Sequence, residues 1–276
     1  MRENAAIHHT FAVCAYKDSP YLEECLRSLA GQTISANIIL CTSTPSPYIE
    51  ETAGRYGIPV YVREGKSDIQ DDWNFAYETA RTRYVTLAHQ DDVYQPDYLE
   101  SFLQAVKKYP DISLYFTAYT AIRNGKPDLG ERTCQVKRLL CSLVRFHRLA
   151  ALGFVKKSCL CLGNSISCPM VTYDRETAGE RPFRSRLKFA LDWEFFWKMA
   201  GKPGRFYYES RPKGFFRIHE GATTSGFTAD HRRSAEEAEM FSHFWPRPIV
   251  RLLMRFYSKS YSTYEDTQAK KGSRDR

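Results

Sequence analysis

Short apolar runs alternate with amphipathic segments over roughly the first third of the chain. Four runs have the length of strands, at residues 11–16, 38–43, 60–62 and 84–88. Near-continuous apolar runs of this kind are typical of strands that are buried on both faces of a parallel sheet. Three segments with helical apolar spacing separate them, at residues 19–31, 47–57 and 70–82. Strands and helices in this alternation predict a parallel sheet with right-handed crossovers.

Residues with capping or turn preferences mark the ends of the predicted helices. Ser19 is the expected N-cap of the first helix, with Pro20 at the first helical position and Gly31 at its end. The second helix is expected to begin at Pro47 and to end at Gly57. The local preferences of these residues set the expected boundaries of the first two helices.

The pattern is less regular in the middle of the chain. Pro96 is expected to open a helix, and a further strand is expected at residues 112–116. Residues 120–136 have the polar composition of a loop. Residues 163–173 alternate between polar and apolar side chains, so we expect them to return to the sheet.

Helical segments are expected to follow towards the C-terminus. An aromatic-rich helix starts at Leu191, and the tail from Thr267 is polar enough to be disordered. We therefore expect one α/β domain over residues 1–228 and a C-terminal helical extension over residues 229–276. A Rossmann-like, mostly parallel central sheet flanked by helices is the predicted fold.

Length and composition place the chain among ordinary globular proteins. It has 276 residues, of which 43% are hydrophobic, enough for one large core. The N-terminus lacks the apolar segment of a signal peptide, and no run approaches the ~18 apolar residues that span a bilayer. The eight cysteines are scattered without zinc-ribbon spacing, which favours reduced thiols in a cytoplasmic protein.

The net charge of +8 is concentrated in two segments. Residues 137–157 contain six Lys or Arg and no acid, and residues 247–276 contain eight Lys or Arg against three acids. The rest of the chain is therefore slightly acidic. Both segments also carry many apolar residues, a combination that suits an anionic membrane surface or an anionic acceptor. Two ordinary helices with solvated basic faces would give the same composition.

Two adjacent carboxylates, Asp91 and Asp92, follow the fourth predicted strand. They should lie at the carboxyl end of a central strand, where open α/β sheets bind their ligands. Adjacent carboxylates repel each other unless a cation lies between them, and Mg²⁺ and Ca²⁺ prefer oxygen ligands. A solvated Asp-Asp turn is the alternative interpretation.

Two common nucleotide-binding motifs are missing. Residues 15–20, after the first predicted strand, contain no glycine, which disfavours a nicotinamide or flavin cofactor. A Walker loop is also absent from the sequence. A sugar-phosphate nucleotidyltransferase would share the sheet and the metal, but it would need a glycine-rich phosphate loop after the first strand.

Five short motifs, taken in their order along the chain, resemble family 2 of the glycosyltransferases, the inverting enzymes with the GT-A fold. The resemblance covers roughly residues 8–225. The motifs are Ser28-Leu29-Ala30-Gly31-Gln32, Asp72-Trp73-Asn74, His89-Gln90-Asp91-Asp92, Leu191-Asp192 and Arg217-Ile218-His219. Each motif alone is a weak match, and their common order makes the resemblance specific.

The resemblance implies a role for each matched residue. Mn or Mg would be held by Asp91 and His219 and would neutralise the departing diphosphate. Asp192 would be the general base that takes the proton of the acceptor hydroxyl. Trp193 and Glu194 would contact the acceptor. The donor-binding residues would be Ala15, Tyr16, Thr42, Ser43, Asp68, Asn74, His89, Gln90, Asp91 and Arg217.

The chain departs from the family pattern at two positions. The acid usual after the second strand is missing from Cys41-Thr42-Ser43-Thr44, and we hypothesise that Asp68 replaces it. His89 stands where the first acid of the metal motif is expected. The sequence therefore does not identify the nucleotide.

The preferred function is transfer of a sugar from a nucleotide-diphosphate donor to a saccharide or lipid-linked acceptor with inversion, as in surface polysaccharide or glycan synthesis. Such an enzyme would be cytoplasmic, at most peripheral at the inner face of the membrane, and would not bind nucleic acid. A non-catalytic membrane- or nucleic-acid-binding protein on a GT-A-like scaffold is the alternative from a different class. The sugar, the linkage and the oligomeric state are left open by the sequence.

Overall fold

A computed structural model of the chain describes residues 8–123, 125–219, 231–255 and 257. The expected domain boundary after residue 228 and the expected polar tail from Thr267 lie outside the described residues. So does the end of the family resemblance, at residues 220–225.

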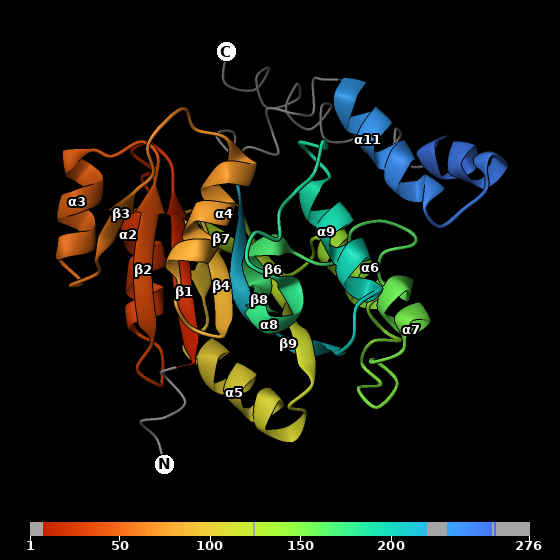
Figure 1. Cartoon of the computed structure of the whole chain (residues 1–276), viewed down its shortest axis with the longest axis horizontal. Helices are drawn as coiled ribbons and strands as arrows, with labels where there is room; N and C mark the ends of the chain where they lie inside the picture. The colour runs from red at the N-terminus through yellow and green to blue at the C-terminus, as the bar shows by residue number, and fades with distance from the viewer. Residues whose placement is uncertain (1–7, 124, 220–230, 256, 258–276) are drawn as a thin grey trace.

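Figure 1 shows a central sheet with helices on both sides. The strands are β1 (His9–Ala15), β2 (Asn37–Thr42), β3 (Val60–Val62), β4 (Tyr84–His89), β5 (Val93–Tyr94), β6 (Ile112–Arg123), β7 (Lys126–Asp128), β8 (Val171–Asp174) and β9 (Arg205–Ile218). Within the described residues their order is β3-β2-β1-β4-β8-β6-β9-β5, with β7 on β6. The strands β3, β2, β1 and β4 are parallel, as are β6 and β9, whereas β8 runs antiparallel to both of its neighbours.

Two layers of helices cover the sheet. The helices are α2 (Leu22–Ala30), α3 (Pro47–Gly54), α4 (Ile69–Thr79), α5 (Tyr98–Lys108), α6 (Arg132–Leu140), α7 (Gly153–Ser158), α8 (Arg175–Ala178), α9 (Leu191–Ala200) and α11 (His231–Ser242), with a short 3-10 turn, η1 (Cys168–Met170). Successive side chains of a strand point to opposite faces. Phe11 and Val13 accordingly pack in one cluster with α2, α3 and α5, and Ala12 packs in the other with α4, α9 and α11.

The predicted N-terminal half is confirmed with small shifts in the boundaries. Ser19 is not the N-cap of the first helix, since α2 starts at Leu22 and its N-cap is Tyr21. The Ser19 hydroxyl instead accepts the N–H of Tyr21 at 3.3 Å and donates to the Asp91 carboxylate at 2.8 Å. α3 begins at Pro47 as expected, with Ser46 as its N-cap, and ends at Gly54 rather than at Gly57.

The expected polar loop over residues 120–136 is wrong. The strand expected at residues 112–116 continues as β6 to Arg123, and α6 begins at Arg132. β6 pairs with β9 in parallel along this extension, and the side chains of Thr117 and Thr120 are buried with their apolar neighbours. Polar residues inside a buried strand concealed its length.

Two other segments differ from the predicted pattern. Only β8, at the end of residues 163–173, returns to the sheet, whereas the residues before it form a loop and η1. β9 has fourteen residues and was not predicted. It carries the ionic residues Glu209, Arg211 and Lys213, which pair with one another or with Asp97. A hydropathy pattern records these charged residues but not the ion pairs that neutralise them, so it does not indicate a strand here.

The C-terminal helices pack against the main body. Met240 and Phe241 of α11 are fully buried, and the Phe241 ring meets that of Trp193 edge to face at 5.1 Å between centroids. All eight cysteines lie in the described residues, and each is a free thiol. Within the part of the chain that the structure describes, every helix is too short or too polar to cross a bilayer.

Candidate active site

The carboxyl ends of β1, β2 and β4 form one edge of the sheet. The strands are in register here, since Cys14 of β1 lies beside both Cys41 of β2 and His89 of β4. The residues that follow these positions therefore meet at a single edge. This is where ligands bind in open α/β sheets.

The loop after β1 is fixed by hydrogen bonds to the neighbouring strands. The N–H of Tyr16 donates to the Gln90 side-chain carbonyl at 3.0 Å, and the Gln90 amide donates to the Tyr16 carbonyl at 2.8 Å. The N–H of Lys17 donates to the hydroxyl of Thr44 at 2.7 Å, and Lys17 has a φ of +53°, which is unusual for a residue with a side chain. The Tyr16 ring is 47% exposed at this fixed loop. It can stack on a planar group such as a nucleobase.

Two hydroxyl residues follow β2 at the same edge. Thr42 is buried, and its hydroxyl accepts the N–H of Thr44 at 3.0 Å. The Ser43 hydroxyl is buried and has no hydrogen-bond partner among the described residues. Of the two, Ser43 is the one whose hydroxyl remains available to a ligand, and Ala15, at the end of β1, offers only backbone.

Asp91 lies between α2 and the end of β9. One carboxylate oxygen accepts the Ser19 hydroxyl at 2.8 Å, and the other lies 3.2 Å from Nε2 of His219. The side chains of Asp91 and His219 are 26% and 18% exposed. The structure therefore brings together the two predicted metal ligands at a partly open position.

Asp92 has a different role from Asp91. It is buried and accepts the backbone N–H of Arg217 at 2.9 Å, and burial raises the pKa of its carboxyl group to about 8. The Arg217 guanidinium donates to the Asp91 carbonyl at 2.9 Å and to Glu24 at 2.5 Å. The Arg217 side chain, 6% exposed, thus ties the Asp-Asp turn to β9. Its contact with a donor stays a prediction.

The two predicted ligands, Asp91 and His219, are compatible with a cation whose other ligands would be waters and substrate phosphates. No group of three or more His, Cys, Asp or Glu side chains that could hold a metal occurs within the described residues. Mg²⁺ is commonly held by one or two protein carboxylates, several waters and substrate phosphates rather than by a closed protein cage. A pair consisting of a carboxylate and an imidazole is compatible with that arrangement.

His89 is an uncharged substitute for the expected acid. Burial lowers the pKa of its imidazole to about 4, against a smaller raising effect of Asp91. Its ring lies 5.3 Å from that of Trp73, and its Nε2 atom is buried without a hydrogen-bond partner among the described residues. His89 can therefore offer a ligand one neutral nitrogen, but no negative charge.

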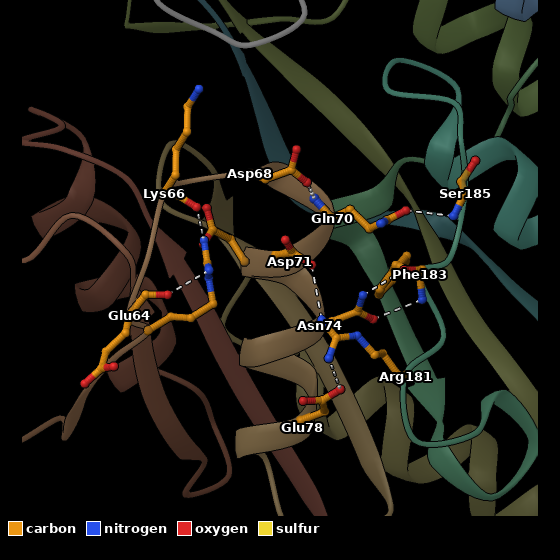
Figure 2. A network of polar contacts seen from close by, with 12 residues as sticks. Glu64, Lys66, Asp68, Gln70, Asp71, Asn74, Glu78, Arg181, Phe183 and Ser185 are labelled. Carbon is orange, nitrogen blue, oxygen red and sulfur yellow. Dashed lines mark hydrogen bonds and ion pairs between the residues drawn. The ribbon is translucent and has the colours of Figure 1, made fainter.

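One face of α4 is connected to residues 181–185, as Figure 2 shows. The amide of Asn74 donates to the Phe183 carbonyl at 2.7 Å and accepts the Phe183 N–H at 3.0 Å. Gln70 accepts the N–H of Ser185 at 2.7 Å, and Arg181 lies 3.1 Å from Asp71. Asn74 is only 1% exposed and both of its polar atoms are bonded. The structure thus places it as a support for this loop rather than at the open edge.

Asp68 lies at the start of α4. It caps the helix by accepting the N–H of Gln70 at 3.0 Å and pairs with Lys188 at 2.7 Å. The hydrogen bond from Lys188 is the main reason why the pKa of Asp68 lies below its usual value. The carboxylate stays about one third exposed.

Asp192 is held in the first turn of α9. One oxygen accepts the side-chain amide of Asn164 at 2.9 Å, and the other accepts the N–H of Trp193 at 2.8 Å. Burial raises the pKa of Asp192 to about 6, while the Trp193 N–H, Lys137 and Asn164 act in the opposite direction. A carboxylate with a pKa in this range is ionised at neutral pH and is a better proton acceptor than an ordinary aspartate.

Lys137 of α6 interacts electrostatically with the same carboxylate. Burial lowers the pKa of its ammonium group, and the negative charge of Asp192 partly offsets this effect. Lys137 and Ser165 line one small cavity with Tyr208 of β9. Ser165 follows Asn164, the residue bonded to Asp192. Lys137 therefore belongs to the surroundings of Asp192, although the sequence analysis assigned it only to a basic segment.

The expectation that Trp193 binds the acceptor is wrong. Its side chain is 3% exposed, and its indole N–H donates to the Leu160 carbonyl at 3.2 Å. Because the ring also packs on Phe241, it belongs to the core. Glu194 lies 3.0 Å from Lys198 one turn later in α9, and its other carboxylate oxygen is buried without a partner within the described chain.

The surroundings of Asp91 and Asp192 are connected by residues 164–170. Asn164 at one end is bonded to Asp192, and the carbonyl of Pro169 near the other end accepts the hydroxyl of Tyr94 at 2.6 Å. Tyr94 follows the Asp-Asp turn by two residues. The carboxylates of both Asp192 and Asp92 raise the pKa of the buried Cys168 thiol, after the larger effect of burial. The two sets of residues thus flank the same short segment.

Several supporting residues were missed by sequence analysis. Glu236 of α11 is the clearest case, because its carboxylate accepts the backbone N–H groups of Lys188, Phe189 and Ala190 at 2.7–3.1 Å. It thereby fixes residues 188–190, which lead directly into α9. Asn164, Lys137 and Ser19 were also missed. Their partners are 28 or more residues away in sequence, so no local spacing indicated them.

The comparisons with known proteins agree with this arrangement. Residues 10–153, slightly more than half of the chain, match the sequence profile of glycosyl transferase family 2. No curated protein matches the whole chain closely enough in sequence to count as a relative.

Three solved structures illustrate the likeness in fold. The first 349 residues of S. aureus TarS in complex with UDP-GlcNAc are 14% identical at a TM-score of 0.58, over 90% of this chain and 70% of that one. The mannosyltransferase PcManGT from Pyrobaculum calidifontis, in complex with GDP-Man and Mn²⁺, is 13% identical with a TM-score of 0.57, and the match covers 89% of this chain and 68% of that one. Glucosyl-3-phosphoglycerate synthase from Mycobacterium tuberculosis, in complex with UDP, is 14% identical with a TM-score of 0.53, and the match covers 86% of this chain and 80% of that one. The predicted GT-A fold is confirmed.

Proposed function

The chain belongs to glycosyl transferase family 2, and on that basis we propose that it transfers a sugar from a nucleotide-diphosphate donor to an acceptor hydroxyl with inversion at the sugar carbon. The observation that supports the proposal is that residues 164–170 are bonded at one end to Asp192, through Asn164, and near the other end to Tyr94, which follows the Asp91-Asp92 turn by two residues. One carboxylate lies at the strand edge where a nucleotide would bind, and the other has the pKa of a base. We assign the chemistry to residues 1–228 and a supporting role to the helices after them.

The donor is proposed to bind along the edge formed by β1, β2 and β4. Tyr16 would stack on the base, and the backbone of Ala15 together with the hydroxyls of Thr42 and Ser43 would line its surroundings. Gln90 would keep the Tyr16 loop in place through its two hydrogen bonds. Asp68, which is partly exposed at the start of α4, and His89 are the remaining candidates for contact with the donor.

Asp91 and His219 would hold the divalent cation, Mn or Mg. When bound, this ion would neutralise the charge that develops on the departing diphosphate. Arg217 and Asp92 would act indirectly, because their hydrogen bonds fix the turn that presents Asp91. Asn74 would act in the same way on residues 181–185.

Asp192 is the proposed general base. As the acceptor oxygen forms its bond to the anomeric carbon, the bond from that carbon to the diphosphate oxygen breaks. The hydroxyl proton passes to Asp192, and the nucleoside diphosphate leaves with the bonding electrons. Asn164 would hold the carboxylate in position, and Glu194 would lie near the acceptor. The relatives with bound ligands contain UDP-GlcNAc, UDP and GDP-Man, so UDP and GDP sugars are the first donors to test.

The proposed acceptor is a saccharide or a lipid-linked saccharide, as in the synthesis of a surface polysaccharide or other glycan. We propose that the protein acts in the cytoplasm, where nucleotide sugars are available. The proposal excludes nucleic acid as a partner.

A thermal-shift screen tests donor binding without knowledge of the acceptor. UDP-, GDP-, dTDP- and CMP-sugars would be added with Mn²⁺, and with a chelator as the control. A ligand at 100 times its Kd stabilises the native state by about 2.7 kcal/mol, because it binds only the folded chain. We expect one nucleotide to raise the melting temperature in a metal-dependent way. A screen in which no nucleotide does so would contradict the proposal and favour a non-catalytic scaffold.

A further inference from the structure

The part of the surface formed by α6, α7 and the turns between them is unusually apolar. Nine of the large hydrophobic side chains that are exposed belong to residues 129–162. They are Leu129, Val136, Leu139, Leu143, Phe146, Leu149, Leu152, Phe154 and Leu162. We call these residues, with the Lys and Arg side chains among them, the basic apolar face. In Figure 1 the helices α6 and α7 lie at the end of the molecule opposite α3.

The turns between the two helices form a ridge of apolar side chains. The N–H of Phe146 donates to the carbonyl of Leu143, that of Leu149 to Phe146, and that of Leu152 to Leu149. Residues three apart lie one above another in such successive turns. The four side chains are 46–63% exposed, whereas Val144 and Ala150 of the same segment are fully buried. The segment thus turns one apolar side to the core and a second one to the outside.

Positive charge surrounds the ridge. There is no Asp or Glu between Arg132 and Tyr173, although this stretch contains seven Lys or Arg. Arg145 and Arg148 are exposed beside Phe146. Neither of them is in an ion pair with any acidic side chain in the described part of the chain. Their charges are therefore available to an anionic surface.

The structure brings the start of the second basic segment next to the last residues of the basic apolar face. The indole N–H of Trp245 donates to the carbonyl of Cys161 at 2.6 Å, and the hydroxyl of Tyr257 donates to that of Leu162 at 3.3 Å. The helix over residues 247–255 exposes Ile249 and Leu252 together with Arg247 and Arg251. Two segments that are separate in sequence thus form neighbouring parts of one surface.

We propose that the basic apolar face docks the protein on the surface of an anionic lipid bilayer. Helical segments with Lys and Arg beside Leu and Phe lie in the interface of such membranes, with their apolar side chains in the acyl boundary. A nucleic acid would use the positive charge but would leave the six leucines in water. A second copy of this face would be repelled by its like charge. An anionic bilayer can both attract the positive charge and bury the leucines.

The position of Lys137 gives this docking a consequence that rests on the proposed function. Lys137 belongs to α6, at the border of the basic apolar face, and its charge acts on Asp192. Docking through α6 would therefore bring the proposed general base near the membrane, where the hydroxyl of a lipid-linked acceptor would be available. Lipid binding itself requires neither a donor nor catalysis.

Vesicle flotation tests the docking directly. The full chain would be mixed with vesicles of phosphatidylcholine alone, or of phosphatidylcholine with about one third phosphatidylglycerol. We expect flotation only with the anionic vesicles and a loss of binding at high salt. Absence of binding to either vesicle, or equal binding to both, would overturn the proposal.

Two pairs of substitutions assign the binding to this face. Arg145→Glu with Arg148→Glu should lower partitioning at least about 25-fold, because each of the two Arg residues near an anionic surface contributes about fivefold. Phe146→Ser with Leu149→Ser should also remove flotation. The matched controls, Lys107→Glu with Lys108→Glu on α5 and Tyr61→Ser with Val62→Ser on β3, carry the same changes at exposed positions elsewhere and should bind like the parent protein.

Two further measurements keep these outcomes interpretable. Circular dichroism should show that all four variants keep the fold, since the substituted side chains are exposed. Light scattering should show whether the parent chain self-associates through this face. We expect to find no self-association that is lost in Phe146→Ser with Leu149→Ser. Such an association would identify the face as a contact between protein copies and would overturn the lipid assignment. The thermal-shift screen is unaffected by either result, so docking and sugar transfer can fail separately.

Discussion

The surroundings of Asp91 and of Asp192 are built in different ways. Asp91 lies at the ends of parallel strands from successive strand-helix units, and its main partners Ser19 and His219 come from the ends of two neighbouring elements. Asp192 is supported by the side-chain amide of Asn164, by the charge of Lys137 of α6 and, through residues 188–190 before α9, by Glu236 of α11. The first site lies at the ends of the parallel strands, whereas the second is built from loops and helices outside those strands.

This difference has a functional counterpart. The sequence profile of the family ends at residue 153, so it includes Asp91 but not Asp192. In the proposed function, the strand edge would bind the nucleotide and the cation. The helices around Asp192 would meet the acceptor. We therefore expect substitutions on the two sides to affect different steps.

The largest expected effect is on transfer, at Asp192. Asp192→Asn keeps the shape of the side chain and removes the proton acceptor. A positioned general base contributes about 10²–10⁴-fold to a rate, so transfer should fall by that factor while the melting temperature changes little. Product formation in a radiochemical assay would measure the fall.

Glu194→Gln is the matched control for that substitution. Glu194 lies two residues further along the same helix and pairs with Lys198. Side chains two residues apart on a helix do not face each other. The control should keep most of the activity. If instead Glu194→Gln abolishes transfer and Asp192→Asn does not, the base has been assigned to the wrong acid.

An intermediate effect is expected on stability, at Asn74. Asn74→Ala would leave the buried N–H and carbonyl of Phe183 without partners, which costs about 1–3 kcal/mol. Denaturant unfolding should show this loss. Asn37→Ala is the control, because Asn37 is exposed and makes a single side-chain hydrogen bond to Thr10. Equal stability of the two variants would argue against a supporting role for Asn74.

The smallest expected effect is a shift of the pH profile, at Lys137. The pKa of Asp192 is about 6, so kcat/KM should rise with pH through this region as the base loses its proton. Lys137 lowers that pKa, and its removal in Lys137→Met should move the acidic limb to higher pH. Lys137→Arg should restore the original limb. A profile that does not move in Lys137→Met would exclude electrostatic tuning by this residue.

The sequence predicted the Asp91 side of the molecule far better than the Asp192 side. Apolar runs and Pro and Gly positions located β1 to β4, because these strands are buried on both faces and are separated by regular helices. The full length of β6 was not predicted because Thr117 and Thr120 interrupt its apolar run. The strand β9 was not predicted at all because it contains several ionic residues. Trp193 was interpreted as an acceptor platform, since its burial against Phe241 of α11 depends on a contact 48 residues away.

Calorimetry of donor binding tests the central claim, that the two carboxylates act at different steps. The donor found in the thermal-shift screen would be titrated with Mn²⁺ into the parent chain, Asp192→Asn and Asp91→Ala. We expect Asp192→Asn to bind the donor within about twofold of the parent, because a few tenths of a kcal/mol is typical where no contact is lost. Asp91→Ala should lose the metal-dependent part of the affinity. Unchanged affinity for the nucleotide-metal complex in Asp91→Ala, or equal weakening in both variants, would contradict the account.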